Sequence, residues 1–104
     1  MGRVMDVFAA LSSPVRRDIL ALLRDGDMTA GDIADHFALS KPTLSGHFTS
    51  LKDAKLILSE RRGNQIIYSL NLSLLEEALL GLMRRVSSSA AGGEDARWQS
   101  DKHA

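Results

Sequence analysis

Residues 40–52, SKPTLSGHFTSLK, are the stretch that decides the fold. Leu44, Phe48 and Leu51 are separated by four and three residues, which places them on one face of a helix. Ser40 is a typical helix cap, and Pro42 tolerates the first helical turn because its missing N–H would be unpaired there. Most other residues carry hydroxyl groups, although Ser, Thr and Gly are poor helix formers. We therefore infer that something besides helix stability selects this polar surface.

The residues before this stretch predict three more helices. Residues 4–11 place apolar side chains on one helical face. Ser13 before Pro14 predicts the start of a second helix, and Thr29 is a suitable cap for a short third one. The connection from the third helix to Ser40 is brief, which is typical of a helix-turn-helix.

Beyond the decisive stretch, the periodicity changes from helical to alternating. Residues 56–71 carry β-branched and aromatic side chains on both sides of Gly63-Asn64, which predicts a β-hairpin. Residues 74–86 predict a final helix with a wide apolar surface. The order α-α-α-α-β-β-α is that of a mainly α fold with a small β-hairpin, the winged helix-turn-helix. We expect one DNA-binding and dimerisation domain over residues 1–86 and a disordered tail over residues 87–104, where periodicity ends.

Composition narrows the class of protein. The chain has 104 residues and no cysteine, so disulfides, thiolate metal sites and cysteine nucleophiles are excluded. No stretch has the length and apolar character of a membrane span or a signal peptide, and we expect a soluble, cytoplasmic protein. The net charge is zero, but residues 36–70 carry five Lys and Arg against two acidic residues. The basic charge therefore gathers in the middle of the chain, as a nucleic-acid partner would require.

Four blocks in order carry a family resemblance: FAALSSPVRRDILALL, MTAGDIADHF, LSKPTLSGHFTSLKDAKLI and RRGNQIIYSLN. They resemble successive blocks of ArsR-type winged helix-turn-helix transcriptional repressors, and in particular the SdpR-like autorepressor branch of that family. The resemblance covers residues 4 to about 83. It implies a repressor that binds a pseudo-palindromic operator on double-stranded DNA as a homodimer and represses its own gene.

The polar surface of the fourth helix is the candidate DNA-reading element. Short hydroxyl side chains let a helix lie close to base edges and phosphates, and the tip of a hairpin wing meets neighbouring phosphates. Gly46 permits close approach, although the family more often has His there. His47 has two interpretations, a DNA contact or a half-buried helix residue, and a solvated helix face or charged turn is the alternative for the whole set. The candidate DNA-binding residues are Ser40, Lys41, Pro42, Thr43, Ser45, Gly46, His47, Thr49, Ser50, Arg61, Arg62, Asn64 and Gln65.

The resemblance also implies a dimer formed by the first and last helices across a two-fold axis. The surplus apolar surface of residues 74–86 agrees with that expectation, and the alternative is a purely intramolecular core. The candidate dimer-interface residues are Val4, Phe8, Leu75, Leu79, Leu82 and Met83.

The metal sites of the family are not expected in this chain. The positions that match its cysteine ligands hold Thr29 and Gly31. His36, His47 and His103 have no ligand spacing. We therefore predict no metal and no cofactor, and the partner that relieves repression would be an unidentified protein or small-molecule inducer. The positions that match a second family site, on the last helix, hold Leu72, Leu74, Arg85 and Ser88.

Two other classes of protein are alternatives to a DNA-binding repressor. Ser, His and Asp occur, but without a glycine-flanked nucleophile or a phosphate-binding loop, so we do not expect an enzyme. The stronger alternative is a winged-helix module for protein-protein interaction, since a fold does not determine function. The basic middle segment and the hydroxyl-rich helix favour DNA.

Overall fold

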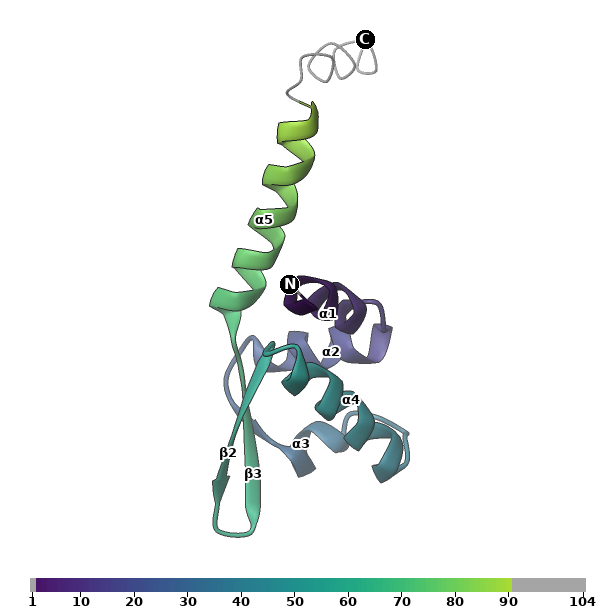
Figure 1. Ribbon diagram of the computed structural model, residues 1–104. Helices are drawn as coiled ribbons and strands as arrows, with labels where there is room; N and C mark the ends of the chain where they lie inside the picture. The colour runs from purple at the N-terminus through teal and green to yellow at the C-terminus, as the bar shows by residue number, and fades with distance from the viewer. Residues whose placement is uncertain (1, 91–104) are drawn as a thin grey trace.

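The computed structural model describes the backbone of residues 2–90 and the side chains of residues 7–87. The element order confirms the predicted winged helix-turn-helix, with one added strand (Figure 1). The elements are α1 (Gly2–Leu11), α2 (Pro14–Leu23), β1 (Met28–Thr29), α3 (Ala30–Ala34), α4 (Lys41–Asp53), β2 (Ile57–Arg62), β3 (Gln65–Leu70) and α5 (Leu72–Ala90).

Three helices begin at the predicted caps. The hydroxyl of Ser13 accepts a hydrogen bond from the backbone N–H of Arg16, and that of Thr29 accepts from Asp32. Ser40 caps α4 by accepting from the N–H of Thr43 at 3.2 Å. Each hydroxyl satisfies a backbone donor that has no partner within its helix, a contribution of about 1 kcal/mol per cap.

The core lies where α1, α2 and α4 pack on one another and where α2, α3 and α4 pack on the sheet. Leu44, Phe48 and Leu51 are buried, as their spacing predicted. Burying a side chain of this size stabilises the fold by about 1.5–3 kcal/mol. The core therefore holds the apolar face of α4 fixed. The buried core residues are Val7, Ala10, Ile19, Leu20, Leu23, Ile33, Leu44, Phe48, Leu51, Ala54, Leu56, Ile57 and Tyr68.

The sheet has three antiparallel strands in the order β1-β3-β2, whereas the sequence predicted only a hairpin. β1 is two residues long, and Met28 pairs with Tyr68 while Thr29 pairs with Ile67. A strand this short has no alternating pattern to recognise in a sequence. The hairpin itself is as predicted, with Gly63 at φ 62° in the turn. Gly adopts this left-handed conformation without steric cost.

The end of α4 adopts a conformation that the sequence did not predict. Lys55 has φ 66°, a left-handed conformation that is unfavourable for a residue with a Cβ. The N–H of Leu56 donates to the carbonyl of Leu51 at 3.0 Å, and the N–H of Lys55 donates to that of Lys52 at 2.9 Å. This is a Schellman cap, which usually has Gly at the Lys55 position. The side chain of Asn71 secures the turn by donating to the carbonyl of Lys55 at 2.9 Å.

Helix α5 extends away from the rest of the molecule, while the β2–β3 tip lies at the opposite end (Figure 1). It continues to Ala90, so the predicted boundary at residue 86 falls inside the helix. Residues 91–104 of the predicted tail lie outside the described residues. Among the helices that the structure describes, none combines the length and apolar character needed to cross a membrane.

Candidate nucleic-acid interface

Helix α4 presents two different polar sides. Lys41, Ser45 and Thr49 follow one another at four-residue spacing, with Pro42 and Gly46 in the next row, and all five are exposed. We call these five residues the outer face of α4. No ion pair of Lys41 occurs within the described part of the chain. The outer face therefore offers one cation, two hydroxyl groups and two residues without side-chain donors.

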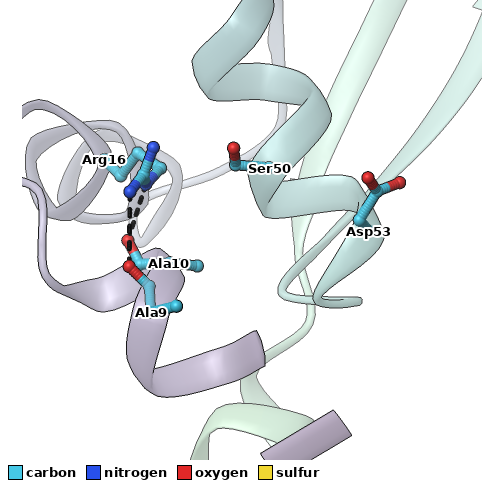
Figure 2. A pocket seen from close by; sticks show the side chains of 5 residues that line it. All are labelled: Ala9, Ala10, Arg16, Ser50 and Asp53. Carbon is cyan, nitrogen blue, oxygen red and sulfur yellow. Dashed lines mark hydrogen bonds between the residues drawn. The ribbon is translucent and has the colours of Figure 1, made fainter. Parts of the chain in front are cut away.

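The second polar side of α4 is turned toward the body of the protein. Thr43, His47 and Ser50 lie on it, and His47 and Ser50 are half-buried. Ser50 lines a hollow of about 280 Å³ with Asp53 of the same helix, Arg16 of α2 and the last turn of α1 (Figure 2). The structure therefore does not bring all the predicted α4 residues onto one surface.

His47 is half-buried on α4. Its Nδ1 atom lies 3.3 Å from a terminal nitrogen of Arg16. Arg16 itself was not predicted as a functional residue. Its partner is far away in the sequence, so no local pattern could have identified the contact.

Two of the predicted hydroxyl residues make hydrogen bonds at the N-terminal end of α4. The Ser40 hydroxyl caps α4 and donates to the Thr43 hydroxyl oxygen at 2.9 Å. Both side chains remain exposed, so Thr43 keeps a proton that it can donate outward. The Ser40 hydroxyl therefore has a structural role as the cap of α4, and the Thr43 hydroxyl is hydrogen-bonded to it.

Gly46 has no structural reason to be glycine within this chain. A Cβ added at Gly46 would meet no atom within 4 Å, and Gly46 is not among the residues with positive φ. Glycine inside a helix costs about 0.5–1 kcal/mol relative to alanine. The open space over Gly46 is consistent with close approach of an external surface.

The hairpin tip carries the second predicted group, and its four side chains are exposed. Arg61 pairs with Ile66, and Arg62 pairs with Gln65, so alternation places the two arginines on opposite faces of the hairpin. Arg62 lies 3.3 Å from a carboxylate oxygen of Glu60. In the described residues Arg61 has no such partner. Arg61 is therefore the freer cation of the wing.

An aromatic contact joins α4 to the wing. The rings of Phe48 and Tyr68 stack with their centroids 4.5 Å apart. Burial raises the pKa of the Tyr68 phenol above 10.0 by removing the phenolate from water. This contact fixes the hairpin relative to the buried face of α4.

Known proteins are similar to this chain in sequence and in architecture. A family of helix-turn-helix domains matches residues 11–60. The transcriptional repressor SdpR of Bacillus subtilis is 53% identical over 74 residues, which are 71% of this chain and 82% of that protein. An arsenical resistance operon repressor of Staphylococcus xylosus is 41% identical over 70 residues, 67% of each chain. The chain belongs to the ArsR family of winged helix-turn-helix transcriptional regulators.

A solved structure agrees with the ArsR assignment over the full architecture. An ArsR-like transcriptional regulator from Rhodococcus sp. RHA1 superposes with a TM-score of 0.77 at 26% identity, covering 98% of this chain and 92% of that one. The outer face of α4 and the wing thus belong to an ArsR-family helix-turn-helix.

The positions that match ArsR metal ligands serve other purposes here. The hydroxyl of Thr29 caps α3, and Gly31 has no side chain to offer a metal. Leu74 packs against the core, and the side chain of Ser88 lies outside the described ones. Among the described residues, no three His, Asp or Glu side chains gather as metal ligands.

Proposed function

We propose that this ArsR-family protein is a transcriptional repressor that binds a pseudo-palindromic operator as a homodimer and represses its own gene. The outer face of α4 enters the major groove, and the hairpin tip contacts neighbouring phosphates. Both roles follow from the way helix-turn-helix proteins dock on DNA. No catalytic step is part of this function.

The observation that carries the proposal is the composition of the outer face. Ser45 and Thr49 can donate to or accept from base edges, and Lys41 supplies a positive charge at the helix N-terminus. Gly46 lies between these side chains with open space above it. A solvated helix face would gain stability from Ala or Glu at these positions, whereas a surface held against a duplex gains from short side chains.

Helix α5 supports the dimer. Its apolar stripe, Leu72, Leu75, Leu79, Leu82 and Val86, is spaced by three and four residues in alternation, the pattern of helices that pack along their length. Leu75 is packed against the core of its own chain, but Leu82 is 43% exposed and Val86 is 60% exposed. A second copy of α5 would cover this stripe. Phe8 is half-exposed on α1, and the Val4 side chain lies outside the described ones.

The proposed repressor has no metal sensor. A release signal that acts through a bound metal would need ligands, and the matching positions hold Thr29 and Gly31. A protein partner or a small-molecule inducer is the proposed source of regulation. A winged-helix module for protein interaction is the second candidate, and it predicts no preference among DNA sequences.

The experiment that tests the proposal is a selection from random DNA. The full-length protein is incubated with a pool of random-sequence duplexes, bound DNA is recovered and sequenced, and the enriched sequence is synthesised as the selected duplex. The proposal predicts an inverted repeat whose half-sites lie about one helical turn apart. It also predicts a match in the region upstream of the protein's own coding sequence. No enrichment would contradict the proposal and favour the protein-interaction module.

A further inference from the structure

The side chain of Arg16 connects two helices other than its own. It lies in the first turn of α2, and its Nε donates to the carbonyl of Ala10 at 2.8 Å, while Nη2 donates to that of Ala9 at 3.3 Å (Figure 2). These carbonyls belong to the last turn of α1, and that of Ala9 also accepts from the N–H of Ser12 at 3.2 Å and from its hydroxyl at 2.7 Å. The remaining terminal nitrogen, Nη1, lies 3.3 Å from Nδ1 of His47 on α4.

The donor and acceptor roles in this contact require one tautomer of the His47 ring. A guanidinium group can only donate hydrogen bonds, so Nδ1 must accept. A hydrogen bond in this contact therefore uses the tautomer of His47 that carries its ring proton on Nε2. An Ala or Leu at this position would leave Arg16 without its partner on α4, whereas an Asn could accept through its side-chain oxygen.

Arg17 provides a natural comparison within the same turn. Its Nη1 donates to the carbonyl of Leu11 at 2.7 Å, so it also neutralises the C-terminal end of α1. In the described part of the chain its side chain makes no hydrogen bond to α4. Both arginines therefore stabilise the end of α1, but of the two only Arg16 also contacts α4.

We propose that Arg16 is a positioning residue for DNA binding, which holds α4 through His47 at a fixed place against α1. This inference rests on the proposed function, because it assumes that α4 reads DNA and that α1 lies at the dimer interface. In such a dimer, the offset between the two reading helices depends on how each α4 is held relative to α1. Operator half-sites have a fixed spacing, so a loosened α4 weakens specific binding.

The test uses four single variants and one double variant of the full chain, together with the selected duplex defined above. Arg16→Lys keeps the positive charge but loses the planar fork that reaches three acceptors. His47→Ala removes only the acceptor on α4, and His47→Asn restores an acceptor with a similar helix propensity. Arg17→Lys is the matched control. Circular dichroism verifies that each variant is folded at the temperature of the binding assay.

We expect Arg16→Lys and His47→Ala each to weaken binding to the selected duplex about tenfold, with binding to a scrambled duplex unchanged. The Arg16→Lys/His47→Ala double variant binds no more weakly than Arg16→Lys alone. His47→Asn recovers most of the affinity, and Arg17→Lys keeps the wild-type preference for the selected duplex.

Two results would overturn the inference while leaving the proposed function intact. Folded Arg16→Lys with wild-type affinity would mean that Arg16 only stabilises the end of α1. The second result is a double variant whose loss of affinity for the selected duplex equals the product of the two single losses, together with no recovery of affinity in His47→Asn. It would mean that His47 contacts DNA independently of Arg16. If the wild-type protein enriches no duplex at all, the proposed function fails and the inference fails with it.

Discussion

The rings of Phe48 and Tyr68 stack with their centroids 4.5 Å apart and an angle of 25° between their planes, and they join α4 to the wing. Aromatic pairs of this geometry contribute about 0.5–1.5 kcal/mol beyond the area they bury. The contact makes the wing and the buried face of α4 one packed unit, so the two elements proposed to contact DNA keep a constant relative position.

The first prediction concerns the titration of Tyr68, which is the single tyrosine of the chain. Burial raises the pKa of its phenol in the folded protein above 10.0. The stability that comes from burying the neutral phenol is present below pH 10 and is lost as the pH rises through the folded-state pKa. Ultraviolet absorbance of the phenolate follows this titration directly. We expect a midpoint above 10.0 in the native protein and near 10.0 in urea, and identical midpoints would contradict burial of the ring.

The second prediction separates stability from DNA binding at Gly46. Gly46→Ala should raise the free energy of unfolding by about 0.5–1 kcal/mol, because the added methyl group meets open space and alanine favours the helix. The same methyl group should weaken binding to the selected duplex. Urea denaturation and fluorescence anisotropy measure the two effects. Ser87→Ala, an uncharged change in exposed helix α5, serves as the control and should leave the affinity unchanged. A stabilised Gly46→Ala variant with wild-type affinity would show that no close approach occurs at this position.

The third prediction concerns the wing arginines. Arg62 is paired with Glu60 at 3.3 Å, and both side chains are exposed. Glu60→Gln should strengthen DNA binding, because it frees Arg62 and removes a negative charge from the wing.

Arg61→Ala should weaken binding to all DNA sequences and lower the slope of log affinity against log salt concentration by about 1, because it removes one phosphate contact. An unchanged salt slope in Arg61→Ala would place the wing away from the phosphates.

The fourth prediction tests the strained turn after α4. Lys55→Gly should raise the free energy of unfolding by about 0.5–1 kcal/mol, since the left-handed conformation is costly for lysine and the glycine entropy cost offsets only part of the gain. Thermal and urea denaturation measure the change. A destabilised variant would mean that the Lys55 side chain contributes more than its strained backbone costs.

The fifth prediction tests the dimer through two neighbouring leucines of α5. Leu79 lies on the apolar stripe and is 42% exposed, whereas Leu80 is 51% exposed but lies off the stripe. Leu79→Glu should shift the protein to a monomer in sedimentation equilibrium, because it places a charge in the proposed contact. Leu80→Glu should remain a dimer. If wild-type protein sediments as a monomer, or if both variants do so equally, the stripe is not the interface.

Much of the fold could be predicted because its signals are local. Ser13, Thr29 and Ser40 are each the residue type that caps a helix, and each does so. Gly63 with Asn64 specified the hairpin turn, and the three- and four-residue spacing of Leu44, Phe48 and Leu51 specified the buried face. These features depend on neighbours in the sequence, which propensity and periodicity describe.

Other features depend on contacts that no local pattern encodes. β1 is only two residues long and exists because Met28 and Thr29 pair with β3. The left-handed Lys55 looks like an ordinary basic residue in the sequence, since Gly is expected at such a cap. Arg16 meets His47 through the packing of α2 against α4. The candidate site was therefore predicted by composition, while the division of α4 into an outer face and a side turned toward Arg16 required the structure.

The most direct test of the central claim, that the outer face of α4 reads DNA sequence, is a fluorescence-anisotropy titration at two salt concentrations. Wild-type protein and the Lys41→Ala and Thr49→Ala variants are titrated into the selected duplex, the protein's own upstream region and a scrambled duplex. We predict that wild-type protein prefers the first two, that both variants lose that preference, and that salt weakens binding throughout. Equal affinity of the wild-type protein for all three duplexes, or no binding even at low salt, would contradict the account.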